Sequence, residues 1–292
     1  MLKLVSVIIP SYNKSYYTVK AIESVLDQTY SNIEIIVVDD NSTDNTLDLL
    51  NKYKKRINII KKEKNTGACN SRNIGMKLAK GYYIAHLDCD DVYIKTKIEK
   101  SINYIEQNKD IDFVYTDVFL IDKDDNKLKP ITKMNNHPGE GKIAKKLLLN
   151  DYVITNSTLI AKNKCFKEIG GFDEPIFIAA DRDILIRLSE KFNAGYIDEK
   201  LTSYRIHNEI INSNIDQTFD EFIYVLNKYK SSSLINSDKF YNICLSNIYY
   251  NYAKYYIRYN DFIKAKKLLI KILLINKYHS KIIKIIIGLL FY

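Results

Sequence analysis

Residues 81–93 carry the sequence GYYIAHLDCDDVY, and the rest of the chain is organised around this stretch. A glycine closes the preceding helical pattern, and the apolar run Tyr82–Leu87 predicts a buried strand. Three carboxylates then follow within four residues, at Asp88, Asp90 and Asp91. Because ligands bind beyond the carboxyl ends of the strands in open α/β sheets, these acids lie where a binding site is expected.

The acid cluster has two interpretations. Three like charges at one point are costly unless a cation neutralises them, so the cluster predicts a Mg²⁺ or Mn²⁺ site. Such a site would also hold an anionic ligand, for example a nucleotide diphosphate. The alternative is an acidic turn that caps the next helix, since aspartate is common in turns. The residues of this stretch alone leave both interpretations open.

The first 90 residues alternate between strand and helix patterns. Apolar and β-branched runs predict strands at residues 4–9, 33–38, 57–61 and 82–87. This alternation is typical of an α/β fold with a mostly parallel sheet and helices on both faces. Polar loops follow three of the strands, namely Ser11–Asn13, Asp39–Asp40 and Asp88–Asp91. Three polar loops at one sheet edge favour a binding site there.

Shorter patterns predict individual elements. Ser42 is a typical N-cap, which predicts a helix over residues 43–55. The run 152–160 predicts a further strand, and a helix is expected to begin near Asp181. His86 lies inside the predicted buried strand, so we expect it to be a core histidine.

The character of the chain changes near Asp216. No strand pattern follows, tyrosines are dense, and the apolar spacing is helical. Tyr256 and Ala265 flank an Asn-Asp turn and resemble one helix–turn–helix of a tetratricopeptide repeat. We therefore expect a first domain over residues 1–215 and a helical C-terminal region over residues 216–292.

The C-terminal region is basic. No acidic residue follows Asp261, and lysines recur at helical spacing opposite isoleucines and leucines. This pattern predicts basic amphipathic helices that lie on an anionic bilayer or dock on a partner. The alternative is a solvated lysine face over a packed helical core. The lysines concerned are Lys264, Lys267, Lys271, Lys277, Lys281 and Lys284.

Composition limits the partners. The 292 residues suffice for one large core with an appendage or for two domains. The net charge of +9 and the isoelectric point near 9.0 indicate contact with anions, such as nucleotides, nucleic acid or an acidic membrane surface. The body of the chain has no basic helix with base-reading residues, so nucleic acid is not an expected partner.

Composition also predicts the compartment. The four cysteines lie far apart without a CxxC pair, so neither a zinc site nor a disulfide framework is expected. Free cysteines fit a reducing, cytosolic compartment. The N-terminal apolar run is short and interrupted at Pro10, so no signal peptide is expected. No stretch approaches the ~20 apolar residues that span a bilayer. We expect a cytoplasmic protein, with peripheral contact to the inner face of the cell membrane as a further hypothesis.

Several motifs together resemble the family 2 glycosyltransferases, which are inverting enzymes of the GT-A fold. The motifs occur in the family's order across roughly the first 210 residues. They are SVIIPSYN at Ser6–Asn13, VVDDNSTDNT at Val37–Thr46, NTGACNSRNIG at Asn65–Gly75, YIAHLDCDD at Tyr83–Asp91, GGFDE at Gly170–Glu174, ADRDILIRL at Ala180–Leu188 and YRIH at Tyr204–His207. The resemblance does not cover the C-terminal region.

The resemblance implies a metal centre. Asp88 and Asp90 correspond to the DxD element, in which Asp90 would ligate the metal and Asp88 would reach the metal shell or the ribose. Asp91 would border the donor sugar. His207 stands where some relatives have a further metal ligand or a diphosphate contact, although a lone loop histidine is more often without such a role. Hard oxygen ligands suit Mn²⁺ or Mg²⁺, and the cation would act as Lewis acid and template for the diphosphate.

The resemblance also implies a nucleotide pocket. Tyr12 would stack on the base, with Pro10 and Asn13 shaping its loop. Asp40 would accept a hydrogen bond from a base N–H group, and Asp39 would support it. The structural alternative for Tyr12 is an ordinary aromatic residue in a turn. The alternative for Asp39 and Asp40 is a helix cap.

Two further residues complete the implied site. Arg72 would contact the diphosphate with its planar fork, the alternative being a surface ion pair. Asp181 would be the general base that takes the proton from the acceptor hydroxyl, the alternative being an N-cap. The family often has an acid immediately before this base, and here the residue is Ala180. Asp183 would support the site or the helix terminus.

These features predict a metal-dependent, inverting glycosyltransferase. The expected donor is a UDP-sugar, with GDP- and dTDP-sugars as alternatives, and the acceptor is a saccharide or a lipid-linked molecule. The family's usual setting is surface polysaccharide or glycolipid assembly. A non-catalytic sugar-nucleotide-binding or interaction module is the alternative, favoured by Ala180. A glycoside hydrolase with two carboxylates is a further class, but it needs no nucleotide pocket.

Overall fold

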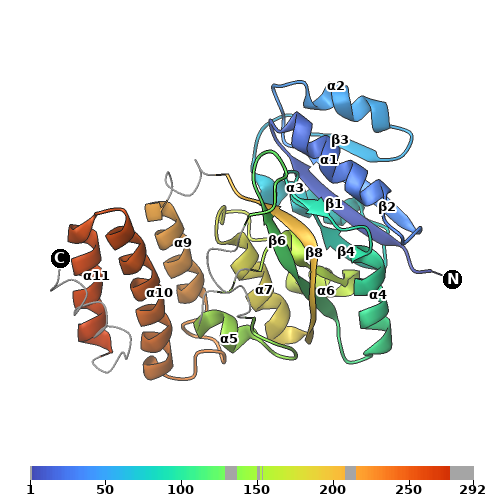
Figure 1. The fold of residues 1–292 in the computed structure, drawn as a ribbon. Coiled ribbons are helices and arrows are strands. Elements are labelled where there is room, and N and C mark those ends of the chain that lie inside the picture. Colours follow the sequence, from blue (N-terminus) through green and yellow to red (C-terminus); the bar gives the residue numbers. More distant parts are fainter. Residues whose placement is uncertain (1, 129–136, 150–151, 153, 208–214, 277–292) are drawn as a thin grey trace. The chain divides into compact units, whose positions relative to one another are not determined.

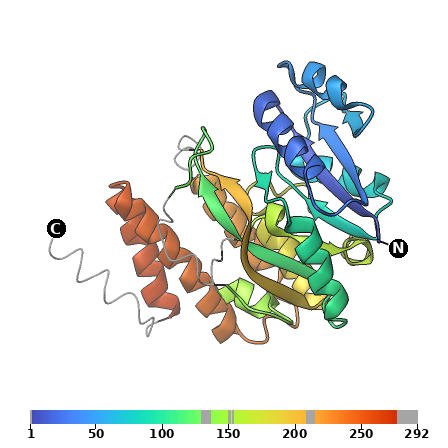
Figure 2. The same cartoon turned by 45° about the vertical axis from the view of Figure 1, so that its right-hand side comes forward.

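The computed structural model describes residues 2–128, 137–149, 152, 154–207 and 215–276. The chain divides into two compact units (Figures 1 and 2). The first unit consists of residues 1–144 and 152–213, and the second of residues 145–151 and 214–292.

The first unit contains one mixed sheet of eight strands among its described residues, in the order β3-β2-β1-β4-β7-β6-β8-β5. Strands β3, β2, β1 and β4 are mutually parallel, and β6 is parallel to β8. Strand β7 is antiparallel to both neighbours, and β5 is antiparallel to β8. The bounds are β1 (Val5–Ser11), β2 (Ile33–Asp39), β3 (Asn58–Lys61), β4 (Tyr83–His86), β5 (Val92–Tyr93), β6 (Phe113–Ile121), β7 (Ile160–Lys162) and β8 (Ala194–Arg205).

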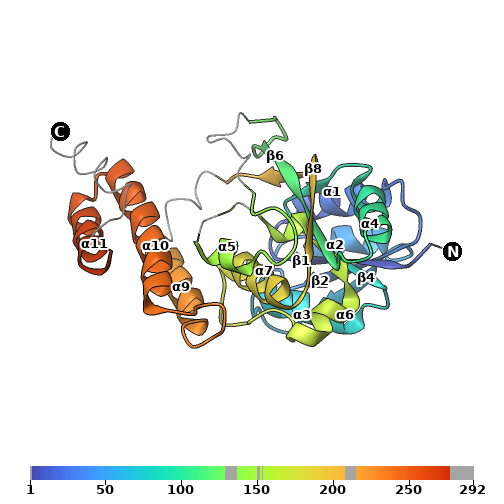
Figure 3. The same cartoon turned by 90° about the horizontal axis from the view of Figure 1, so that it is seen from below.

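Helices cover both faces of this sheet (Figures 1 and 3). Side chains alternate along β1, and Val7 and Ile9 pack in one cluster with Ile22 of α1 and Ile98 of α4. The intervening Ile8 faces α3 on the other side. The α/β prediction is therefore confirmed. The helices are α1 (Ser15–Leu26), α2 (Thr46–Leu50), α3 (Ala68–Leu78), α4 (Lys97–Gln107), α6 (Asn163–Ile169) and α7 (Ala180–Lys191), with 3₁₀ turns η1 (Asn51–Tyr53) and η2 (Asn156–Thr158).

Gly75 allows α3 to lie close to β1. A Cβ atom at this position would come within 2.5 Å of the Ile8 side chain, which is fully buried in the central strand. His86 is opposite Ile8 in the parallel register, is fully buried as predicted, and contacts the ring of Phe166 in α6. Helices α3 and α6 therefore share the face of the sheet opposite α1 and α4.

Two sequence-based expectations about single elements are wrong. Ser42 is not an N-cap: helix α2 begins only at Thr46, and the Ser42 hydroxyl instead accepts a hydrogen bond from the Asn13 N–H group, 3.0 Å away. Of the predicted strand at 152–160, only the last residue is in a strand among the residues described there. Residues 156–158 form η2, because their polar side chains bond to neighbouring groups, and β7 begins at Ile160.

The second unit is helical in its described part. It contains α9 (Ile215–Lys228), α10 (Asp238–Arg258), α11 (Phe262–Ile275) and all but the first residue of α5 (Ala144–Leu149). Helices α10 and α11 form a hairpin whose turn is closed by the Asp261 side chain, which accepts from the Lys264 N–H group at 3.0 Å. The predicted helical segment after the sheet is therefore confirmed.

The hairpin buries Tyr256 and Ala265, the two residues that suggested a tetratricopeptide-like unit. No helix among the described residues is long and apolar enough to cross a membrane. Lys277, Lys281 and Lys284 of the predicted basic helices lie outside the described residues.

Candidate active site

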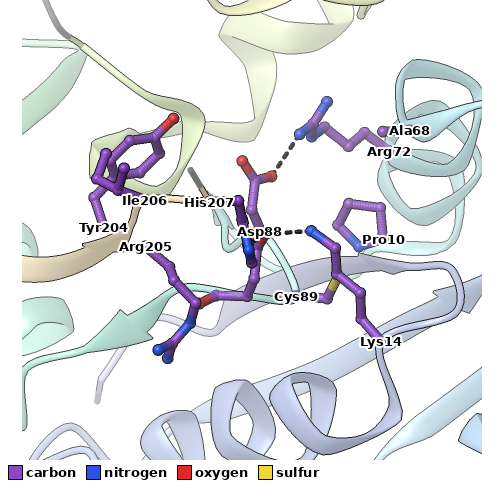
Figure 4. A pocket seen from close by; sticks show the side chains of 11 residues that line it. Pro10, Lys14, Ala68, Arg72, Asp88, Cys89, Tyr204, Arg205, Ile206 and His207 are labelled. Atoms are coloured by element: carbon purple, nitrogen blue, oxygen red, sulfur yellow. Dashed lines mark hydrogen bonds and ion pairs between the residues drawn. The ribbon is translucent and has the colours of Figure 1, made fainter. Parts of the chain in front are cut away.

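A pocket of about 330 Å³ opens at the carboxyl ends of β1 and β4. Among the residues predicted for the site, Pro10, Arg72, Asp88, Asp90 and His207 line this pocket. Figure 4 shows Arg72 and Lys14 pointing toward the acid cluster. The loops after two parallel strands thus meet at one sheet edge, as the alternating pattern predicts.

Asp90 is the most strongly contacted acid of the pocket. Its Oδ2 atom accepts a hydrogen bond from the Lys14 ammonium and lies 2.8 Å from Nε2 of His207. Burial favours the protonated form of Asp90, but His207 and Lys14 outweigh that effect and hold the pKa of this carboxyl well below its usual value. Asp90 is therefore ionised at neutral pH.

Asp88 forms an ion pair with Arg72. One guanidinium nitrogen of Arg72 lies 2.5 Å from Oδ1 of Asp88. Burial disfavours the charged guanidinium, but Asp88 and Asp181 outweigh it and raise the pKa of Arg72. Arg72 is only 6% exposed, so the surface alternative is wrong, whereas the Asp88 side chain is 24% exposed at the pocket. The Nε atom of Arg72 is buried and has no hydrogen-bond partner within the described part of the chain.

Asp91 is not among the residues that line the pocket. It is 1% exposed and accepts hydrogen bonds from the Ser157 hydroxyl at 2.5 Å and the Arg205 N–H group at 2.9 Å. Burial, Asp88 and Asp90 raise its pKa. Its role beside the donor sugar stays a prediction. Helix α4 has no side-chain cap, so the acid cluster does not cap the next helix.

Asp181 is the second residue of α7, and the N-cap position is occupied by Ala179. The capping alternative is therefore wrong. Its carboxylate accepts hydrogen bonds from Asn156, from the backbone N–H at 3.1 Å and from the side-chain amide at 2.5 Å. Burial and the charge of Asp88 raise the pKa of Asp181 to about 7, although Arg72 and Asn156 oppose the shift. A carboxylate with this pKa is suited to accept a proton at neutral pH.

The loop after β1 is braced by Asn13. This residue has a positive φ of 49°, and its side-chain oxygen accepts from the Thr43 N–H group at 2.8 Å. Tyr12 beside it is 43% exposed, and Pro10 lines the pocket. The exposed ring leaves room for a base to stack, and the roles of these residues stay predictions.

Asp39 and Asp40 are buried at the end of β2. Asp40 accepts from the Thr66 N–H group at 3.0 Å, the Gly67 N–H group at 2.8 Å and the Lys62 ammonium at 2.5 Å. These bonds hold the turn that leads into α3, the helix that carries Arg72. The Asp40 carboxylate therefore stabilises a loop of the site, and its contact with a base stays a prediction.

Several residues of the site are not predictable from the sequence pattern. Lys14 and Arg205 lie within quoted motifs, or directly beside them, but no periodicity marks their contacts. Arg205 has no exposed side-chain surface, and its Nε donates to the Asp90 carbonyl at 2.8 Å. The 3₁₀ turn Asn156–Thr158 was read as part of a strand, although its three consecutive polar residues are a signal against a buried strand.

The acids fit a hard divalent cation. Asp88, Asp90 and His207 offer carboxylate oxygens and an imidazole nitrogen to the same pocket, and Asp90 is ionised. No three histidine, cysteine or acidic side chains of the described residues already surround one point. Phosphate oxygens and water would complete the coordination shell, as is usual for Mg²⁺.

Known proteins resemble this chain. A family model described as glycosyl transferase family 2 matches residues 6–170. The UDP-Glc:alpha-D-GlcNAc-diphosphoundecaprenol beta-1,3-glucosyltransferase WfaP of Escherichia coli is 37% identical over 236 residues, which cover 79% of this chain and 87% of WfaP. The putative teichuronic acid biosynthesis glycosyltransferase TuaG of Bacillus subtilis is 35% identical, and the match covers 72% of this chain and 82% of TuaG.

Solved structures share the fold. The structure of S. aureus TarS 1-349 in complex with UDP-GlcNAc has a TM-score of 0.61 at 18% identity and covers 91% of this chain and 90% of TarS 1-349. The mannosyltransferase PcManGT from Pyrobaculum calidifontis, in complex with GDP-Man and Mn²⁺, has a TM-score of 0.66 at 12% identity and covers 91% and 74%. At these identities the likeness shows the fold alone. Both proteins have the GT-A fold, so the GT-A prediction is confirmed.

Proposed function

Since this chain belongs to glycosyl transferase family 2 and is a glycosyltransferase, we propose that it transfers a sugar, with inversion, from a UDP-sugar to a lipid-linked saccharide. The observation that carries the proposal is the pocket at the strand ends, where an ionised Asp90 and a buried Arg72 face the same space. The carboxylate of Asp90 suits a divalent cation, and the positive charge of Arg72 suits the diphosphate that this cation would hold.

Arg72 binds the diphosphate. The buried Nε group of Arg72 has no partner among the described residues, and its guanidinium is fixed by Asp88 and by the ring of Phe172, 5.2 Å away. A planar guanidinium that lines the pocket suits contact with phosphate oxygens. WfaP is named for a UDP-Glc donor, which makes a UDP-sugar the first candidate here and GDP- or dTDP-sugars the alternatives.

Asp90, Asp88 and His207 would hold the divalent cation, Mn²⁺ or Mg²⁺. Bound there, it would supply Lewis-acid stabilisation of the negative charge on the diphosphate leaving group. Lys14 shares the Asp90 carboxylate with His207, so it counters the negative charge of the acid cluster from the β1 loop.

Asp181 accepts the proton of the acceptor hydroxyl while that oxygen attacks the anomeric carbon. The C–O bond to the diphosphate breaks as the new glycosidic bond forms, so a single displacement inverts the configuration. Two hydrogen bonds from Asn156 orient the carboxylate. A pKa of about 7 leaves a substantial ionised fraction at neutral pH.

A thermal-shift panel tests the donor and the cation together. We expect UDP-sugars to stabilise the protein with Mn²⁺ or Mg²⁺ and not with EDTA, because a ligand at 100 times its dissociation constant adds about 2.7 kcal/mol. Equal shifts with EDTA would contradict the cation, and no shift with any nucleotide sugar would contradict the donor site. Binding without release of nucleotide diphosphate would favour the non-catalytic module that Ala180 suggests.

Asp90→Asn should remove both the metal-dependent shift and the turnover while the protein stays folded. The matched control is Asp124→Asn, because Asp124 is an exposed acid in the hairpin after β6. Turnover in the Asp90 variant comparable to the control would remove the proposed metal role.

An acceptor on a lipid would require contact with a membrane, and α11 offers a surface for it. Ile263 and Leu274 are 72% and 76% exposed, and Lys267 and Lys271 are exposed beside them. Apolar side chains flanked by lysines suit an anionic bilayer surface. We place the protein on the inner face of the cell membrane as part of surface polysaccharide or glycolipid assembly.

Sedimentation with phosphatidylglycerol vesicles tests this contact. Exchanging Lys267 and Lys271 for glutamate should release the protein, since each lysine near an anionic surface contributes about 1 kcal/mol. The control is the same exchange at Lys54 and Lys55, which are exposed in the sheet unit. Equal binding of the two double variants would contradict a membrane role for α11.

A further inference from the structure

Lys97 is a fully buried lysine at the first position of α4. Its ammonium group donates to the carbonyl of Thr158 at 2.7 Å and to the hydroxyl of Thr116 at 3.2 Å. The pKa of Lys97 falls to about 7 because of burial, and no carboxylate of the described residues opposes that shift. The ring of Tyr93 also lies beside this ammonium group, with its centroid 5.6 Å away. Lysine is almost never fully buried without an acidic partner, so burial beside neutral groups alone calls for an explanation.

The Thr158 carbonyl belongs to η2, the 3₁₀ turn that contacts the acids of the site. Asn156 donates twice to Asp181. The next residue, Ser157, donates from its hydroxyl to Asp91 and accepts from the backbone N–H group of Asp88 at 3.0 Å. Consecutive residues of one turn therefore contact the base and the acid cluster, and the third residue contacts Lys97.

We propose that Lys97 is a positioning residue for sugar transfer: by binding the Thr158 carbonyl from the core, it fixes the turn that orients Asp181 and the backbone of Asp88. This inference rests on the proposed function, because it assigns Lys97 to the geometry of the same reaction. Lys97 itself does not line the pocket and acts through the turn.

The turn depends on a donor from outside. Within and beside it, the local backbone bonds are Thr158 N–H to the Thr155 carbonyl at 2.9 Å and Leu159 N–H to the Asn156 carbonyl at 3.0 Å. Neither satisfies the buried carbonyl of Thr158, and an unsatisfied buried carbonyl is costly. The ammonium group of Lys97 in α4 supplies a donor to this carbonyl.

Lys97→Met removes the donor and keeps a long apolar side chain. With UDP-glucose and Mn²⁺, the variant should lose kcat by about 10²-fold through misplacement of the base. The KM for UDP-glucose should stay within about 2-fold, because Arg72 and Asp90 do not contact Lys97. The control is Lys100→Met on the same helix, where the lysine is exposed and pairs with Glu199. Its kcat and KM should equal those of the unmodified protein.

The pH profile separates positioning from general stability. The bonds from Asn156 lower the pKa of Asp181, so a displaced turn moves the acidic limb of kcat to higher pH in Lys97→Met and not in Lys100→Met. A merely destabilised protein would lose active molecules without moving that limb. Unchanged kcat and an unchanged limb in Lys97→Met would overturn the inference.

Thr116→Val decides the case if Lys97→Met does not fold. This substitution conserves shape and removes the second acceptor of Lys97, so kcat should fall a few-fold with KM unchanged; unaltered kcat would overturn the inference. Hydrogen exchange distinguishes failure of the proposed function. If the unmodified protein releases no UDP from UDP-glucose, the proposed function fails, but faster amide exchange at residues 156–159 in Lys97→Met still supports the role of Lys97 in fixing the turn. Unchanged exchange overturns that role.

Discussion

Replacing Asn156 by alanine should shift the pH dependence of sugar transfer while leaving the proposed base in place. Asn156 donates to Asp181 from its backbone at 3.1 Å and from its side chain at 2.5 Å. Both bonds stabilise the ionised carboxylate and oppose burial and Asp88, which raise the pKa of Asp181 to about 7. The alanine variant keeps the backbone bond and loses the side-chain bond, so the pKa of Asp181 should rise further.

The magnitude follows from the free energy of one hydrogen bond to a charged group. Such a bond contributes about 1.5–3 kcal/mol, and one pKa unit corresponds to about 1.4 kcal/mol, so the pKa should rise by about 1–2 units. About half of the Asp181 carboxylates are ionised at pH 7 before the change, and about 1–10% afterwards. The kcat at pH 7 should therefore fall about 5- to 50-fold and recover as the pH increases.

The assay is the rate of UDP release from a saturating UDP-sugar with a divalent cation, between about pH 5.5 and 9.5, a range that brackets the expected pKa values. Asn108→Ala is the control, because Asn108 is the C-cap of α4 and its side-chain amide donates to the Tyr104 carbonyl of that helix at 2.8 Å. Asp181→Asn should bind the donor and release no UDP at any pH. An acidic limb that does not move in Asn156→Ala, or full turnover in Asp181→Asn, would refute Asp181 as the base.

Two other changes test the site and its support. Arg72→Lys keeps the positive charge but loses the planar fork, so the KM for the UDP-sugar should rise about 10-fold, as for the loss of about 1.4 kcal/mol of binding, whereas a KM equal to that of the unmodified protein would speak against diphosphate contact. Gly75→Ala should lower the free energy of unfolding in urea by about 1–3 kcal/mol, because the new Cβ would meet Ile8 at 2.5 Å, and an unchanged urea midpoint would show that α3 can move away from β1.

Much of the fold was predictable from the sequence because its signals are local. The apolar runs and the helical spacing before Asp88 each depend on neighbouring residues, and the four parallel strands of the structure follow them closely. Parallel strands joined by helices place their carboxyl ends at one edge, so the meeting of the loops after β1 and β4 also followed from the pattern. The N-cap prediction for Ser42 is wrong because the backbone N–H group that donates to its hydroxyl belongs to Asn13, in another loop.

The parts of the site that sequence reasoning did not reach depend on contacts between distant segments. Asn156 and Asp181 are separated by 25 positions, Asp91 and Ser157 by 66, and Lys97 and Thr158 by 61. No periodicity of the chain records such pairs, and the polar run at 156–158 reads alone as an interrupted strand. By itself the sequence determined the four parallel strands and the sheet edge that gathers the acids. Tertiary packing decided that Asp90 is ionised, that the pKa of Asp181 is close to 7 and that Lys97 is buried. The reason is that burial and opposing charge arise only when these distant segments meet.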